Sequence, residues 1–151
     1  MVRQGLYWAS AGRTTVSGLL PVLLCAVLLG CATHPWRIQM TIATDANNNS
    51  PVLISVVLPK NPTLFKKLLD MTAKQWFGQR EQLLRDHRRD LEETYFEFIP
   101  GQQVPEMNRK VSSSVSQGIL FVNSQTPGSH RYTFATNQAL KIGFAQQSVN
   151  L

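Results

Sequence analysis

Cysteine is scarce in this sequence of 151 residues, and both of its cysteines lie near the beginning. Cys25 falls inside an apolar stretch and Cys31 follows that stretch, so residues 32–151 contain no thiol. This part of the chain therefore cannot form a disulfide, bind a metal through cysteine or use a thiol nucleophile. The histidines are not paired in sequence, and we expect each of them to be a solvated residue without a metal or catalytic role: His34, His87 and His130.

Catalytic sequence motifs are also absent. The chain has no nucleophile elbow, no P-loop, no HExxH pair and no glycine-rich dinucleotide turn. Glu92, Glu93 and Glu97 could supply carboxylates for acid–base catalysis, but their position beside a predicted strand favours a solvated strand edge. We therefore expect no enzyme, no bound metal and no small-molecule substrate. The alternative, an enzyme acting on the cell wall or on a small molecule, requires a pocket with convergent polar groups.

A hydrophobic run long enough for a permanent membrane span is missing as well. Residues 16–29 form an uncharged, mostly apolar stretch of 14 residues that contains Pro21 and is preceded by Arg3 and Arg13. A membrane-spanning helix needs about 20 apolar residues. The arrangement is typical of a secretory signal peptide.

The end of this stretch predicts a lipoprotein. Residues 28–31 (Leu-Leu-Gly-Cys) fit the bacterial lipobox, so we expect residues 1–30 to be a lipoprotein signal peptide and residues 31–35 to be a lipidated tether. Cys31 is then the lipid attachment site, with covalent diacylglycerol and an N-acyl chain and no other cofactor. Ala32, rather than aspartate, follows the cysteine, which favours an outer-membrane location with the domain facing the periplasm.

The positive net charge of the chain becomes smaller without the signal peptide. The full sequence has 15 Lys and Arg against 9 Asp and Glu, a net charge of +6, and loss of residues 1–30 leaves +4 on 121 residues. In residues 79–93 four arginines alternate with five acidic residues, which predicts a solvated helix with Glu81–Arg85 and Arg89–Glu93 ion pairs. We therefore expect no nucleic-acid partner.

Residues 36–42 alternate between apolar and polar side chains and predict a strand with one solvated face. Residues 51–58 are apolar on both faces, so we expect a helix to cover the second face of this strand. That helix is predicted next, from residue 63 to Trp76, with Gly78 ending or bending it and residues 79–93 forming a second short helix. Trp76 is expected to pack in the core.

After residue 94 the apolar pattern returns to a period of two. Five further strands are predicted between turn signals, at residues 95–99, 111–116, 119–123, 131–135 and 140–145. We therefore predict a mainly β fold, a seven- to eight-stranded β-sandwich. It forms a single domain over residues 36–151 with a helical insertion after the second strand, at about residues 62–91. The polar loops at residues 45–50 and 126–130 are the candidate contact surfaces.

Several segments resemble the outer-membrane lipoproteins of type VI secretion systems, the TssJ (SciN) family. They are the lipobox, the strand Ser-Pro-Val-Leu-Ile-Ser-Val-Val-Leu at residues 50–58, the Phe-Ile-Pro-Gly-Gln turn at residues 98–102, and residues 118–122 followed by residues 130–132. The resemblance extends over most of residues 31–145. It implies a transthyretin-like sandwich with an added helix.

The resemblance also implies a function and a binding loop. In that family the loop between the first two strands binds the periplasmic part of the inner-membrane protein TssM, so the chain would be a non-enzymatic assembly and anchoring component of the secretion membrane complex. By position the partner-binding residues are Asp45, Ala46, Asn47, Asn48, Asn49 and Ser50. The alternative is a stand-alone envelope lipoprotein, or a secretin-type pilot, that binds another protein or a ligand.

Overall fold

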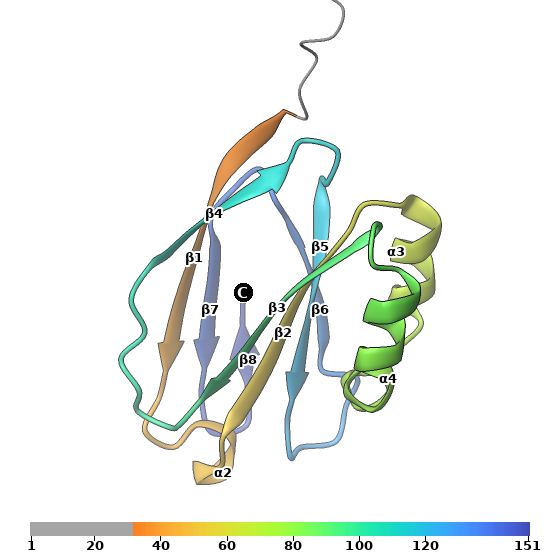
Figure 1. Ribbon diagram of the computed structural model, residues 1–151. Coiled ribbons are helices and arrows are strands. Elements are labelled where there is room, and N and C mark those ends of the chain that lie inside the picture. Colours follow the sequence, from red (N-terminus) through yellow and green to blue (C-terminus); the bar gives the residue numbers. More distant parts are fainter. Residues whose placement is uncertain (1–31) are drawn as a thin grey trace, which may run out of the picture. The chain divides into compact units, whose positions relative to one another are not determined.

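The computed structural model describes residues 32–151, so Cys31 and the predicted signal peptide at residues 1–30 lie outside it. Two four-stranded sheets pack face to face (Figure 1). The first sheet contains β1 (Thr33–Ile42), β4 (Met107–Ser112), β7 (Leu140–Phe144) and β8 (Val149–Asn150), in the order β4-β1-β7-β8. The second contains β2 (Val52–Pro59), β3 (Leu91–Phe98), β5 (Gln117–Asn123) and β6 (Arg131–Ala135), in the order β3-β2-β5-β6. The prediction of a mainly β sandwich is confirmed.

Strand β1 has the predicted alternation, with four buried side chains facing the second sheet: Trp36, Ile38, Met40 and Ile42. It begins at Thr33, three residues earlier than expected, because residues 33–35 pair with residues 110–112 of β4. Most of the expected tether at residues 31–35 is therefore part of the sheet. Trp36 stacks on Phe134 with 5.3 Å between ring centroids, and its Nε1 donates to the Gln138 carbonyl at 3.0 Å.

Strand β2 is buried on both faces, as its apolar sequence predicts. Val52, Ile54 and Val56 belong to the core between the sheets. On the other face, Val57 belongs to a second cluster with Ile119 and Phe121 of β5. Two helices, α3 (Pro62–Leu69) and α4 (Ala73–Asp86), cover that part of the second sheet and supply five further residues of this cluster (Figure 1): Leu64, Leu68, Ala73, Trp76 and Leu83. Leu91 of β3 also belongs to it. The predicted helical insertion after the second strand is confirmed.

The boundary between the two helices differs from the prediction. The chain leaves the helix at Asp70, and α4 starts after Thr72, whereas Gly78 lies inside α4. Thr72 and Gln75 form a capping box: the Gln75 N–H donates to Thr72 Oγ1 at 3.2 Å, and the Thr72 N–H donates to Gln75 Oε1 at 2.8 Å. These reciprocal hydrogen bonds start a new helix and outweigh the propensity cost of one glycine, about 1 kcal/mol.

The second helix, expected to continue to residue 93, ends earlier. Helix α4 stops at Asp86, and β3 begins at Leu91, so Glu92 and Glu93 belong to a strand rather than to a helix. The expected helical pair Arg89–Glu93 is therefore wrong, whereas Glu81 and Arg85 do lie together, at 3.7 Å. Within residues 32–151, no helix combines the length and the apolar character that crossing a membrane requires.

Candidate protein-binding site

The predicted lipid attachment site, Cys31, lies outside the described residues, but the residue after it is well fixed. The Ala32 carbonyl accepts hydrogen bonds from the Ser113 N–H and from Ser113 Oγ, both at 2.9 Å. Ser113 lies in the connection between β4 and β5, and β1 starts at the next residue, Thr33. A group attached to Cys31 would thus be bonded one residue away from this end of the sandwich.

The predicted partner-binding loop contains a short turn, α2 (Ala46–Asn49), at the opposite end of the sheets (Figure 1). Its backbone is left-handed, with φ of 48° at Asn47, 54° at Asn48 and 60° at Asn49. Asparagine tolerates this region better than most residues because its short side chain can hydrogen-bond locally. The run of three asparagines therefore favours one defined turn here.

Hydrogen bonds hold this turn in place. Asn47 Nδ2 donates to the Pro51 carbonyl at 2.9 Å, and Asn47 Oδ1 accepts from the Gln125 N–H at 3.0 Å. The N–H of Asn48 donates to the Gln146 carbonyl at 3.1 Å, and Gln125 Nε2 donates to Ser50 Oγ at 2.7 Å. The loop is therefore connected to the loops that follow β5 and β7.

The six predicted binding residues divide into two groups. Ala46 is fully buried, while Asn47 and Ser50 are half-buried and make the hydrogen bonds described above. These three residues shape the turn. Asp45, Asn48 and Asn49 are exposed, so they are the residues that can contact a partner.

The connection that follows β3 lies against the same loop. The Gly101 N–H donates to the Ala43 carbonyl at 2.9 Å, and a Cβ at Gly101, whose φ is +75°, would lie 3.2 Å from Thr44 Cγ2. Ile99, just before this turn, is 64% exposed. Ile99 was not predicted as a surface residue, because it ends an apolar strand pattern. Its position before Pro100-Gly101 was the available signal, since the alternation stops there.

The second predicted contact loop, residues 126–130, has a different neighbour. The Ala73 N–H at the start of α4 donates to the Ser129 carbonyl at 2.7 Å, and His130 Nε2 lies 2.6 Å from the Thr126 carbonyl. This loop therefore supports the start of α4. The contact with α2 comes instead from Gln125, just before it.

The histidines are half-buried rather than solvated as expected. His34 Nε2 lies 3.0 Å from the Thr136 carbonyl, and His87 is the C-terminal cap of α4. His34 and His130 thus hold backbone segments in place. No group of three His, Asp or Glu residues that could hold a metal ion occurs in the part of the chain that the structure describes.

Glu93 is buried, which corrects the expectation of a solvated carboxylate. Its side chain is 6% exposed, and its Oε1 accepts from Ser55 Oγ and from Arg80 Nε, the latter at 2.6 Å. The Arg80 guanidinium lies 4.4 Å from the centre of the Tyr95 ring, and the hydrogen bond to Glu93 raises the pKa of Arg80. Arg80 is accordingly a link between α4 and the second sheet rather than part of a solvated ion-paired face.

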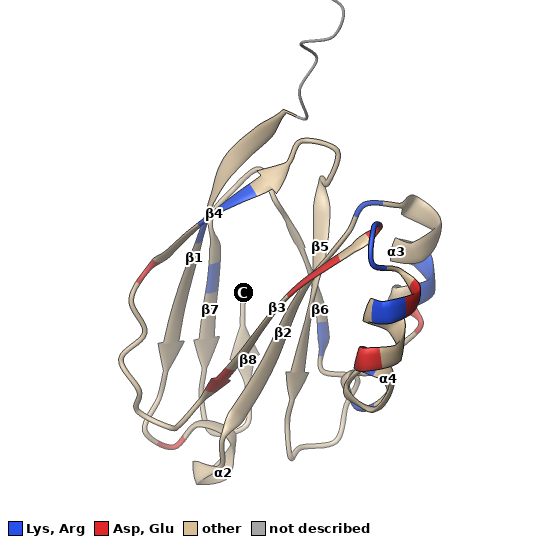
Figure 2. Cartoon of the chain, in the orientation of Figure 1, with Lys and Arg blue, Asp and Glu red and all other residues tan. Residues whose placement is uncertain are grey.

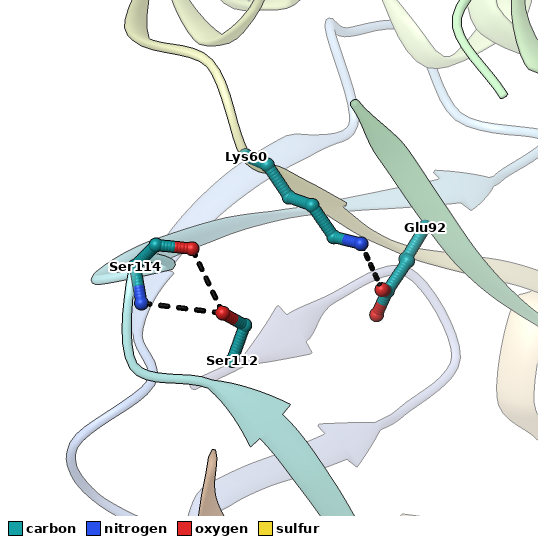
Figure 3. A network of polar contacts seen from close by, with 4 residues as sticks. All are labelled: Lys60, Glu92, Ser112 and Ser114. Carbon is teal, nitrogen blue, oxygen red and sulfur yellow. Dashed lines mark hydrogen bonds and ion pairs between the residues drawn. The ribbon is translucent and has the colours of Figure 1, made fainter. Parts of the chain in front are cut away.

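A hollow of about 110 Å³ lies at the Thr33 end of the sandwich, between the start of α3 and the β4–β5 connection. Lys60, which lines the hollow, turns toward Glu92 and forms an ion pair with it (Figure 3). The hydroxyls of Ser112 and Ser114 lie 2.8 Å apart in the same view. The lining of the hollow is formed by prolines, serines, Phe65, Asn61, Gln117 and the paired Lys60. This combination has no carboxylate–histidine or nucleophile–base arrangement.

No protein-family model matches this sequence, and no curated protein matches it. Solved structures do match. The type VI secretion lipoprotein TssJ1 from Pseudomonas aeruginosa is 15% identical with a TM-score of 0.61, over 79% of this chain and 95% of that chain. Lip from Serratia marcescens, a membrane-bound component of the type VI secretion system, is 13% identical with a TM-score of 0.58, over 77% and 95%.

A third structure, described as the type VI secretion protein TssM C-terminal domain from EAEC, is 12% identical with a TM-score of 0.54, over 79% of this chain and 96% of that chain. Because all three sequence identities are low, these matches establish the fold alone. Residues 32–151 have the fold of the type VI secretion lipoproteins of the TssJ type.

Proposed function

We propose that this chain is a lipid-anchored, non-enzymatic assembly component of a type VI secretion membrane complex. The observation that carries the proposal is the likeness to TssJ1 and Lip, which spans 95% of each of those chains. The lipobox ending at Cys31 supports it, because a lipoprotein of this fold needs an acylated cysteine directly before the domain.

The anchor in this proposal is diacylglycerol with an N-acyl chain on Cys31, in the outer membrane. Each buried methylene stabilises membrane binding by about 0.8 kcal/mol, so several acyl chains hold firmly. Strand β1 runs ten residues from Thr33 toward α2, about 30 Å at 3.3 Å per residue. The lipid would hold one end of the sandwich at the membrane, and α2 would project into the periplasm from the other end.

The partner in this proposal is the periplasmic part of a TssM-like inner-membrane protein, and α2 with its flanking residues is the contact. The turn is suited to binding because its backbone is already fixed by hydrogen bonds. A fixed loop loses less conformational entropy on binding than a mobile one, so more of the contact energy appears as affinity.

A double substitution tests the contact without unfolding the loop. The double variant Asn48→Gly, Asn49→Gly removes two of the three exposed side chains of the loop, while glycine keeps the left-handed backbone. We expect the variant to fold normally and to lose capture of the periplasmic domain of the host's own TssM protein in a pull-down. Asn137→Gly, in an exposed turn at the other end of the sheets, is the matched control. Normal capture by the double variant would contradict the proposed contact.

The anchor is tested separately with Cys31→Ser. We expect the wild-type protein to sediment with outer membranes and to carry a diacylglycerol thioether by mass spectrometry, and the variant to do neither. An unmodified thiol on the mature wild-type protein, or an intact leader, would refute the anchored location.

A further inference from the structure

The outer face of β3 is only partly covered by the helical insertion. Helices α3 and α4 pack over Val57, Ile119 and Phe121, on β2 and β5. Among residues 32–151, three large hydrophobic side chains are exposed, and two of them belong to this strand: Tyr95 at 38% and Ile99, one residue after its end, at 64%. Because they are four residues apart in an extended segment, they lie on the same side, with Glu97 between them.

Both apolar side chains are held in position. Arg80, which is fixed by Glu93, lies 4.4 Å from the Tyr95 ring centre. The Ile99 N–H donates to Gln102 Oε1 at 3.1 Å, within the turn that pairs with Ala43. An aromatic and an aliphatic side chain presented on a rigid backbone are the usual anchors of a protein interface.

The strip formed by Tyr95, Glu97 and Ile99 continues into the α2 loop. Val52 pairs with Phe98, so the exposed Pro51 directly after the loop lies next to Ile99. Figure 1 shows the end of β3 and α2 at the same end of the sheets. The strip and the exposed residues of the loop therefore form one continuous surface.

The segments around Ile99 and α2 are acidic. The described residues together carry a net charge of +4, yet residues 43–51 and 97–105 contain two carboxylates and no Lys or Arg: Asp45 and Glu97. Figure 2 shows red at the end of β3 and in the turn before α2. Complementarity requires a partner surface with basic residues around an apolar pocket.

We propose that Tyr95, Glu97 and Ile99 extend the docking surface of α2, and that the partner meets them with a basic patch surrounding an apolar pocket that receives Ile99. This inference rests on the proposed function, in which a TssM-like periplasmic domain docks at this end. It adds the strand surface and the chemistry of the partner to the loop contact.

The test measures the dissociation constant between the full lipidated protein in detergent and the periplasmic domain of the host's own TssM protein. Ile99→Ala is expected to weaken binding about tenfold or more, the change expected for an interface anchor. Leu151→Ala is the matched control, because Leu151 is 53% exposed and lies after β8 in the other sheet. We expect it to leave binding unchanged.

Charge is tested with Glu97→Lys. We expect about tenfold weaker binding near 0.1 M salt and a much smaller difference near 1 M, where the Debye length falls to about 3 Å. Glu81→Lys on the solvent side of α4 is the control, since its side chain is 81% exposed. It should bind like the wild type at both salt concentrations.

The outcomes separate this inference from the proposed function. If Ile99→Ala and Glu97→Lys bind like the wild type while the Asn48 and Asn49 double variant does not, the strand surface is refuted and the loop contact stands. If the wild-type protein does not bind the TssM domain, the proposed function fails and this inference fails with it. A wild-type homodimer that Ile99→Ala abolishes would also overturn the inference, because the strip would then be a contact between two copies.

Discussion

The ion pair between Arg80 and Glu93 joins the helical insertion to the sandwich, and Arg80→Met tests its contribution. The substitution keeps most of the aliphatic side chain but leaves the Glu93 carboxylate, 6% exposed, with the Ser55 hydroxyl as its remaining described partner. Breaking a buried pair from one side costs about 3–5 kcal/mol. The Arg80 side chain is 27% exposed, so water reaches part of the site, and we expect a loss of about 2 kcal/mol.

Urea unfolding of the lipid-free mature domain measures this loss. With a slope of about 2 kcal/mol per M, a loss of about 2 kcal/mol lowers the midpoint by about 1 M at unchanged slope. The control is Arg85→Met on the same helix, because its 3.7 Å pair with Glu81 is exposed on both sides and such pairs contribute about 0.5 kcal/mol or less. Adding Glu93→Gln to Arg80→Met should recover part of the loss, since it removes the unpaired charge. Equal losses of stability in Arg80→Met and Arg85→Met would refute a special contribution of the buried Arg80–Glu93 pair.

Substitutions at three further positions probe the two hydrophobic clusters and are measured by thermal or urea unfolding. Gly118→Ala should cost about 1–3 kcal/mol, because the new Cβ would lie 2.2 Å from Phe134 Cζ; an unchanged midpoint would contradict this packing. Trp76, stacked on Phe121, has an indole N–H without a hydrogen-bond partner among the described residues. Trp76→Phe should therefore cost much less than Trp76→Ala, for which we expect about 3–5 kcal/mol. Burial raises the pKa of Tyr132, so the unfolded state loses this proton at lower pH than the folded state, and stability falls as pH rises above about 10. Tyr132→Phe should reduce that fall, and an unchanged pH profile would contradict it.

The sequence predicts the layers of this fold well because local patterns decide them. Alternation in residues 36–42 identifies the face of β1 that packs on the second sheet, and the two apolar faces of β2 require a covering helix, which the structure confirms. The predicted helix boundary at Gly78 is wrong, because the capping box at Thr72 and Gln75 starts the second helix and one glycine does not end it. Both residues are visible in the sequence, at the spacing that the capping box requires.

The environment of Glu93 could not be predicted in the same way. Its partners, Ser55 and Arg80, are 38 and 13 residues away, and only the packing of α4 over the second sheet brings the three together. Ile99 was hidden for a related reason, since an apolar residue at a strand end has the same pattern whether it is buried or exposed. The three asparagines predict a loop, but the left-handed turn depends on hydrogen bonds to Gln125, Ala145 and Gln146 from distant parts of the chain.

The topology suits the mechanical part of the proposed function. A complex that is held by lipid at Cys31 and by a partner at α2 would apply force to the two ends of the same strand, β1. This strand lies inside the first sheet, with six residue pairs to β4 along its first part and five to the parallel β7 along its second part. Force along β1 acts across these backbone hydrogen bonds together rather than one at a time, because the bonds lie across the strand direction. The first sheet would therefore transmit the load between the membrane and the contact at α2.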